Sequence, residues 1–484
     1  MPTLTILNPI PSIMLKTTLN AALLFLCSFS FLNAQTPCDN GFADGFPCEG
    51  YDLQSRLTPS EMFGSFANDS WGWVDPDTGI EYALIGLNNG TAFIDISNPN
   101  APLLVGKLAT HTGNSTWRDI KVYQNHAFIV SEASGHGMQV FDLTRLRNVS
   151  NPPENFTEDA HYDGFGNAHN IVINEESGFA YGVGTTTFSG GPHFVNIQDP
   201  LNPVAAGGYS QNSYSHDAQV ITYDGPDADY IGREILIGSN ADILAIVDIT
   251  DKDNPIEIST IVYSNLGYTH QGWFTEDKRY FLLGDETDEI IFGFNTRTII
   301  FDFVDLDNPV IHFEYEGTNT STDHNGYVVG DKYYLASYRA GMRVIDIADI
   351  ANENMTEIGY FDTVPGSDQV GTSGLWNVYP FFPSGNIVLS GDSGFTLVTD
   401  PDFLNVDDVT SADSQSIYPN PASTHINIQT ENTPLGDVRI YNILGQEVLH
   451  TTTQKISLQI NTSALPSGVY FVQTAVTTQR IIVQ

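Results

Sequence analysis

The chain has 484 residues and a formal net charge of −40 at pH 7, because its 58 acidic residues outnumber 18 basic ones. A surface of this sign repels nucleic acid phosphates and anionic membranes, which excludes both as partners. The length exceeds one ordinary domain and predicts a large closed architecture or several domains.

Residues 1–34 have the features of a secretory signal. The segment contains no acidic residue, one lysine (Lys16), an apolar stretch over residues 21–32 and the small residue Ala34 at its end. This layout predicts a signal peptide at 1–34, with Met14 as an alternative translation start. No later window holds 18 apolar residues, so we expect no transmembrane segment in the mature chain.

Two cysteines remain after the signal peptide, because Cys27 is removed with it. In an exported protein a close pair such as Cys38 and Cys48 usually forms a disulfide. The segment between them is rich in Gly, Asp and Pro and has little capacity to order itself. A metal site is the weaker alternative, since no second Cys or His pair completes the ligands.

One short pattern recurs along residues 35–402: an apolar strand, an Asp or its replacement, another apolar residue and a turn. The copies are centred on Asp95, Asp142, Asn196, Asp248, Asp302, Asp346 and Thr399. The number of residues between successive copies is in the range of a four-stranded propeller blade. Each unit also contains further β-branched and aromatic stretches bounded by Gly, Asn and Pro, and no stretch shows a sustained helical period.

We therefore predict an all-β chain whose residues 35–402 form a seven-bladed β-propeller. The seventh copy lacks a fourth strand, because the chain turns polar after Phe403. An unassigned strand at residues 53–57 is expected to complete that blade and close the ring. The repeated Asp is expected to accept backbone N–H bonds in the turn after its strand. Calcium binding is the alternative, but it needs several closely spaced oxygen ligands.

The Asp-bearing strands resemble LVIVD repeats. The succession "NDSWGW", "EYALIGLNNGTAFIDIS", "AHNIVIN", "SHDAQV", "YTHQGWFTEDKRYFLLGDE" and "DHNGYV" resembles choice-of-anchor B family proteins over about residues 36–400. That family shares an exported domain joined to varied cell-surface anchors. The resemblance therefore implies location, and it implies no particular chemistry.

A second module follows a polar linker at 403–415. Residues 416–484 alternate strands with turns at 442–445 and 466–468, which predicts a small immunoglobulin-like β-sandwich. The segments "YPNP", "IYN", "GQE" and "GVY" resemble the type A sorting domain of type IX secretion. The resemblance implies recognition by the type IX machinery and delivery to the outer surface of a Gram-negative bacterium, or release. An adhesive immunoglobulin-like module is the alternative.

Aligning the units by their first strand puts seven residues in one register: Trp71, Arg118, His169, His216, His270, His324 and Trp376. The first strand of a blade lines the central channel, so these residues are expected to form a ring near one mouth. The next positions are Gly72, Asp119, Asn170, Asp217, Gln271, Asn325 and Asn377. The loops between second and third strands should open on the same side, and they carry Glu132, Glu286 and Asp392.

These residues predict a ligand site at the channel mouth, formed by the seven aligned residues with Asp217, Glu132 and Glu286. One hypothesis is a divalent metal held by His169, His216, His270 and His324, because neutral imidazole is a natural ligand of zinc, copper, iron or nickel. The other is that each His bonds to the neighbouring blade and keeps the ring in register. A ring can also spread its histidines too far apart to share an ion with bonds near about 2.1 Å.

Three functions remain open from the sequence. The first is an exported binding protein that presents its face to a glycan, peptide or protein partner, with the tryptophans supplying flat apolar contact. The second is a metal-dependent hydrolase or lyase that uses the four histidines. The third is an inert component of the cell surface. Apart from the four histidines nothing in the sequence supports catalysis, because no Gly-x-Ser-x-Gly elbow, P-loop or dinucleotide fingerprint is present, and enzyme status stays open.

Overall fold

The computed structural model describes residues 35–401, 415–419, 422–430, 434–442, 446–466, 468–474 and 478–483. The predicted signal peptide and most of the predicted linker lie outside the described residues. The regular secondary structure of the described chain is almost all β-strand, with one short α-helix and a few 3₁₀ turns, in agreement with the expected all-β class. None of the described helices is long and apolar enough to cross a membrane.

Residues 42–399 form seven antiparallel sheets, apart from one short parallel edge pairing. The first sheet contains β4 (Ala67–Val74), β5 (Glu81–Leu87), β6 (Gly90–Asp95), β7 (Leu103–Ala109) and β11 (Glu154–Phe156). The second contains β8 (Arg118–Tyr123), β9 (His126–Ser131), β10 (Met138–Asp142) and β12 (Ala160–Tyr162). The third contains β13 (Asn170–Asn174), β14 (Phe179–Val183), β15 (His193–Asn196) and β16 (Val204–Gly208).

The next four sheets repeat this order. They contain β17 (Asp217–Thr222), β18 (Glu234–Ser239), β19 (Leu244–Asp248) and β20 (Ile256–Ile261); β21 (Thr269–Phe274), β22 (Tyr280–Asp285), β23 (Arg297–Asp302) and β24 (Val310–Glu316); β25 (Asp323–Val329), β26 (Lys332–Ser337), β27 (Gly341–Asp346) and β28 (Thr356–Phe361); and β29 (Leu375–Tyr379), β30 (Asn386–Gly391), β31 (Gly394–Thr399) and β3 (Asp52–Leu57). The short helix α1 (Asp288–Phe292) follows β22.

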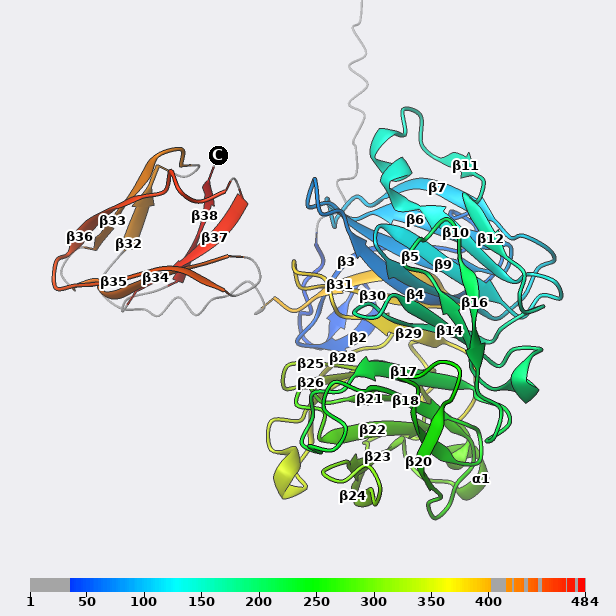
Figure 1. Cartoon of the computed structure of the whole chain (residues 1–484). Helices are drawn as coiled ribbons and strands as arrows, with labels where there is room; N and C mark the ends of the chain where they lie inside the picture. The colour runs from blue at the N-terminus through cyan, green and yellow to red at the C-terminus, as the bar shows by residue number, and fades with distance from the viewer. Residues whose placement is uncertain are drawn as a thin grey trace, which may run out of the picture.

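The sheets are arranged around a common axis (Figure 1). The first strand of each sheet contacts the first strand of the next, and β29 of the last sheet contacts β4 of the first, which closes the ring. Neighbouring sheets share their apolar cores. For example, Phe93 of the first sheet stacks on Phe141 of the second with ring centroids 4.6 Å apart. Stability of the ring therefore comes from face-to-face burial between consecutive sheets.

The repeated Asp has the turn-capping role that the sequence predicts. In six sheets its side chain accepts a hydrogen bond from the backbone N–H two residues later, at 2.8–3.0 Å. The six acceptors are Asp95, Asp142, Asn196, Asp248, Asp302 and Asp346. These carboxylate and amide oxygens satisfy a backbone N–H in the turn that follows each third strand, which explains why Asp or Asn recurs at this position.

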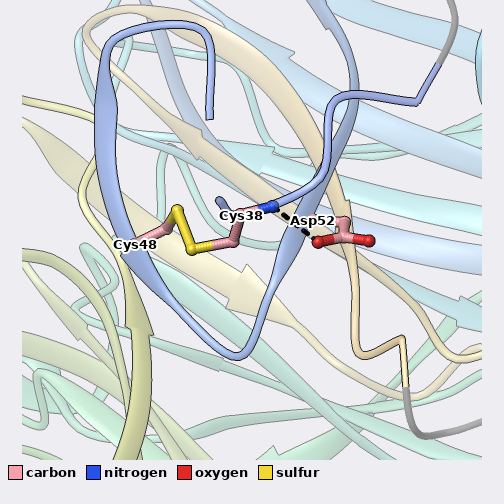
Figure 2. The surroundings of a disulfide bond; sticks show 3 residues. All are labelled: Cys38, Cys48 and Asp52. Atoms are coloured by element: carbon pink, nitrogen blue, oxygen red, sulfur yellow. Dashed lines mark hydrogen bonds between the residues drawn. A yellow bond between two sulfur atoms is a disulfide. The ribbon is translucent and has the colours of Figure 1, made fainter. Parts of the chain in front are cut away.

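The N-terminal segment joins the last two sheets of the ring. β3 pairs antiparallel with β31 and takes the outermost place in the seventh sheet. The hairpin of β1 (Phe42–Ala43) and β2 (Phe46–Glu49) adds to β28 of the sixth sheet. The predicted disulfide between Cys38 and Cys48 is confirmed, and the Cys38 N–H donates to Asp52 at 2.7 Å (Figure 2). The disulfide therefore ties the hairpin to the strand that closes the ring.

We expect the Cys38→Ser/Cys48→Ser variant to lose about 2–4 kcal/mol of unfolding free energy. The disulfide closes a short loop of low intrinsic order, so its removal raises the entropy of the unfolded segment that must pair with β28. Urea unfolding of the variant and of the wild type measures the difference. Reduction of the wild type should reproduce the loss, and identical midpoints for all three samples would contradict this role.

Residues 415–483 form the two remaining sheets, which pack as a small β-sandwich. One sheet has β32 (Gln415–Tyr418), β33 (His425–Thr430) and β36 (Ser457–Asn461); the other has β34 (Gly436–Asn442), β35 (Glu447–Thr453), β37 (Gly468–Gln473) and β38 (Thr478–Val483). Their shared core includes Ile426, Ile428, Val438, Ile440 and Val472. Alternating apolar residues along these strands bury one face of each sheet.

Candidate functional site

Four consecutive sheets bring the predicted histidines together. His169 and His216 directly precede β13 and β17, whereas His270 and His324 lie in β21 and β25. Successive imidazole centroids are 4.1, 4.4 and 4.4 Å apart. The rings therefore form a contiguous arc at one end of the channel, where the first strands begin.

The arc lines a cavity of about 410 Å³ at this mouth. Trp376 continues the arc, with its ring centroid 4.8 Å from that of His324, and Trp117 lies at the rim with 42% of its side chain exposed. The loops after the second strands supply Glu286, Tyr338 and Asp392 to the same cavity. These loops and the first-strand residues thus meet on one side of the ring, as expected from the sequence.

Hydrogen bonds orient several of these side chains. His169 Nδ1 lies 2.6 Å from the Glu132 carboxylate, and His324 Nδ1 donates to the Trp376 carbonyl at 2.5 Å. The hydroxyl of Tyr338 donates to Glu286 Oε1 at 2.7 Å. His324 is thereby held with its proton on Nδ1, which leaves Nε2 as its lone-pair nitrogen.

Burial keeps the imidazoles of His216, His270 and His324 neutral. Burial, followed by the proximity of His169, lowers the pKa of His270 to about 3. Burial, followed by His270, lowers the pKa of His324 to about 3 as well. The pKa of His216 falls well below its ordinary value, first through burial and then through His169 and His270. Neutral imidazole carries the lone pair that a metal or a hydrogen-bond donor requires.

The buried donor set at the centre of the arc is incomplete. Both ring nitrogens of His270 lack a hydrogen-bond partner among the described residues. The His324 carbonyl lies near the His270 ring and acts to raise its pKa, but this contact does not have the geometry of a hydrogen bond. One ligand atom each from His270, Glu286 and His324 lies within 4.8 Å of the others. His270 Nε2 is 3.7 Å from Glu286 Oε2. An unsatisfied buried polar group costs about 1–3 kcal/mol, so this cluster is suited to an added ligand.

The structure corrects the alignment of the first unit. Ala67 pairs with Leu87 as Asp323 pairs with Ser337 in the sixth sheet, and both strands then skip two residues in a bulge. Asn68 is therefore the counterpart of His324, and Trp71 is the counterpart of Tyr327. Trp71 does not line the histidine cavity; it lies at the other end of the channel.

Two further predicted residues lie outside this cavity. The guanidinium of Arg118 is buried and bonds to the Leu87 carbonyl, to Thr110 and to His136, so it joins the first and second sheets. Asp217 lies one position deeper than His216, in a polar layer beneath the arc. Burial, followed by the Asp119 charge, raises the pKa of Asp217 to about 7. Arg118 therefore supports the ring, Asp217 accepts the N–H of Ala218 in its own strand, and neither residue lines the histidine cavity.

The polar layer separates the two ends of the channel, and its side chains form hydrogen bonds between neighbouring sheets. The residues that follow the histidine positions include Asp69, Asp119, Asn170, Asp217, Gln271, Asn325 and Asn377. Asp119 accepts the Ile171 N–H of the next sheet at 2.7 Å, Gln271 accepts the Gly326 N–H at 2.9 Å, and Asn377 donates to the Ser70 carbonyl at 2.7 Å. The register-holding role that the sequence suggests for the histidines therefore belongs largely to this layer.

One lysine neutralises the layer. Lys121 Nζ lies 2.6 Å from Asp119 and 3.8 Å from Asp69. Burial acts to raise the pKa of Asp119, but the Lys121 charge and the hydrogen bonds from Asp69, the Ile171 N–H and Lys121 together lower that pKa below its ordinary value. The pKa of Asp69 is raised well above its ordinary value, first by burial and then by Asp119. Asp119 is thus the carboxylate whose charge depends on Lys121.

We expect Lys121→Met to destabilise the propeller by about 3–5 kcal/mol, because it leaves the Asp119 carboxylate buried without its cation. Lys121→Met/Asp119→Asn removes both charges and should recover most of that loss. Unfolding free energies in urea at pH 7 check both variants. Equal unfolding free energies of the two variants would show that Lys121 does not stabilise the charge of Asp119.

Tyr338 is the main site residue that sequence reasoning missed. It follows β26 in the loop that also carries Arg339, and it orients Glu286 from the neighbouring sheet. A pattern in the sequence would have placed Trp71 correctly. Trp71, Trp273, Tyr327 and Tyr379 stand in one register, and each aromatic follows its histidine-level residue by three positions. Aligning the units on this aromatic residue places Asn68 correctly.

Comparison with known families finds two matches. Residues 81–110 match the LVIVD repeat, and residues 416–484 match the secretion system C-terminal sorting domain. Both confirm resemblances seen in the sequence, whereas membership of the choice-of-anchor B family stays a prediction. The sorting domain indicates engagement with the type IX secretion machinery and export to the cell surface or the medium of a Gram-negative bacterium. No curated protein matches the chain.

Three solved structures illustrate the fold similarity. PorZ, an essential bacterial surface component of the type IX secretion system of Porphyromonas gingivalis, is 12% identical with a TM-score of 0.45, over 84% of this chain and 58% of that one. The Cps50 (Swd1) β-propeller domain of Myceliophteria thermophila is 10% identical with a TM-score of 0.42, over 66% and 93%. Hydrazine synthase of Kuenenia stuttgartiensis is 11% identical with a TM-score of 0.46, over 72% and 96%. This chain thus spans little more than half of the PorZ chain.

Proposed function

We propose that this exported propeller is a surface-displayed or released binding protein, and that its histidine-lined mouth binds one divalent transition-metal ion through His270, Glu286 and His324. The observation that carries the proposal is the convergence of three ligand atoms within 4.8 Å of one another, two from buried histidines and one from the partly buried Glu286. Imidazole nitrogen with one carboxylate is a ligand set suited to zinc and its transition-metal neighbours.

The remaining contacts of the three side chains suit this role. Trp376 and Tyr338 occupy His324 Nδ1 and Glu286 Oε1, so His324 Nε2 and Glu286 Oε2 are left for the ion. Such outer partners fix the orientation of metal ligands. Ligands of a tetrahedral ion with bonds of about 2.1 Å lie roughly 3.4 Å apart, so small side-chain rotations would complete the site.

The four-histidine site is less well supported than this triad. His169 is bound to Glu132, and it is separated from His324 by the rings of His216 and His270. One ion with short bonds cannot reach along the whole arc. Neither the comparisons nor the described geometry supports the alternative of a metal-dependent hydrolase or lyase. The exposed Trp117 and the cavity beside the triad leave room for a polar partner that contacts the bound ion.

Metal loading of the mature protein tests the proposal. After treatment with a chelator, the protein is dialysed separately against Zn²⁺, Co²⁺, Ni²⁺ and Cu²⁺, and its metal content is measured by atomic emission. We expect about one ion per chain for at least one of these metals, and a higher unfolding temperature in its presence. A chain that retains no metal in all four solutions would refute the proposal.

A further inference from the structure

The opposite end of the channel holds a second and larger cavity of about 600 Å³. It is lined where the first strands end, by Asn174 at the end of β13 with Glu175 after it, and by Thr222 at the end of β17 with Asp224 beyond it. The polar layer lies between this cavity and the histidine arc, as the order of residues along each first strand shows. The two cavities are therefore separate binding spaces.

Aromatic side chains form one wall of this cavity. The ring centroid of Trp71 lies 5.1 Å from that of Tyr379 and 6.1 Å from that of Phe381, and the ring of Trp273 lies 6.2 Å from that of Phe381. Trp71, Trp273 and Phe381 are only half-buried in the described chain. Flat ring surface is thus open inside a hollow of the size used for small-molecule ligands.

The charges around the aromatic wall select the kind of ligand. Lys121 Nζ lies 4.4 Å above the Trp71 ring and is paired with Asp119, so a cation already occupies that aromatic face. At the rim, the exposed carboxylates of Glu175, Glu176 and Asp224 outnumber the partly exposed ammonium of Lys278. A cationic ligand would meet Lys121 at the floor, and an anionic ligand would meet the rim carboxylates. A neutral ligand with apolar faces and many hydroxyl groups avoids both conflicts.

We propose that this cavity binds a neutral oligosaccharide of two or three sugar units. The C–H faces of a sugar ring would stack on Trp273 and Phe381, while its hydroxyls would donate to the carboxylates of Glu175 and Asp224. The export domain delivers the chain outside the cell, where the cavity meets extracellular glycans. This site does not depend on the metal site at the other mouth.

Tryptophan fluorescence gives a direct readout, because three of the five tryptophans of the chain line this cavity: Trp71, Trp73 and Trp273. The metal-free mature protein is titrated with neutral disaccharides and trisaccharides built from glucose, galactose, mannose, xylose and N-acetylglucosamine. We expect at least one of them to change the emission saturably. Calorimetry with the same sugar then measures its affinity.

Two variants test the assigned contacts. Trp273→Ala removes a stacking surface, and Glu175→Gln changes an exposed rim residue with little effect on packing. Each variant should lower the affinity for the sugar by at least about tenfold. Asp253→Asn, in an exposed outer turn, is the matched control and should bind like the wild type. Melting curves verify that each variant is folded, and Glu175→Gln keeps the test valid should Trp273→Ala unfold.

Two outcomes would overturn the proposal. The first is that no sugar of the panel binds to the wild type, including the case in which trimethyllysine binds instead and assigns the cavity to cations. The second is that a sugar binds with equal affinity to the wild type and to the folded Trp273→Ala and Glu175→Gln variants, which would place it elsewhere. Metal content is measured on the same samples, so failure of the metal site is recorded separately.

Discussion

The His270→Ala/His324→Ala variant is expected to lose its bound transition metal, with affinity lowered by at least about 100-fold. Loss of a single supporting partner around a metal typically costs 10–100-fold, and this variant removes two of the three direct ligands. Equilibrium dialysis followed by metal analysis, at matched protein concentration, measures the change. A folded double variant that keeps one ion per chain would exclude the triad as the binding site.

Single variants distinguish the triad from a site that uses the whole arc. Glu286→Gln should weaken metal binding, because it replaces the charged ligand but keeps the shape that packs against Tyr338. His169→Ala should retain the ion, since Glu132 already engages that ring. Loss of metal from His169→Ala, with the fold intact by circular dichroism, would instead favour the four-histidine arrangement.

Deletion of residues 416–484 is expected to abolish export beyond the outer membrane. These residues match the sorting domain, and the propeller closes its own ring through β3 and β31 without using any strand of the sandwich. The truncated chain should therefore accumulate in the periplasm as a folded propeller. Cell fractionation with immunoblotting of periplasm, outer membrane and medium measures its location.

The matched control attaches residues 416–484 to an unrelated periplasmic protein that carries its own signal peptide. We expect that fusion to reach the cell surface or the medium in the same host. Normal export of the truncated propeller, or retention of the fusion, would show that the address lies elsewhere in the chain. Melting curves of the truncated chain check that retention does not result from unfolding.

The local features of the propeller follow directly from the residues. Asp95 and its counterparts occur where a strand must turn, and each bonds to an N–H only two residues away. Cys38 and Cys48 are close in the chain, so their pairing needs no knowledge of the fold. The missing fourth strand of the last unit and the spare strand at residues 53–57 likewise show how the ring closes.

The errors lie where a side chain interacts with another sheet. The first unit has the same bulge as the sixth, so Asn68 corresponds to His324 and Trp71 to Tyr327, three residues away from the register that the sequence alignment assigned. Arg118 shares the register of the histidines, but its long side chain finds acceptors on Leu87 and Thr110 instead of the channel. A repeat alignment gives the position of a residue along its strand and does not give the direction of a long side chain.

The sequence by itself therefore determined the export address, the all-β class, the repeating unit, the disulfide and the set of histidines that reach one mouth. These depend on interactions between residues that are near in the chain or recur at a fixed period. Only the tertiary structure decided that His270, Glu286 and His324 converge, that Lys121 neutralises the channel, and that the aromatic residues form a second cavity. His324 reaches His270 from the next sheet, and Trp71 reaches Phe381 across the closure of the ring, so these distances are set by how consecutive sheets pack around the axis.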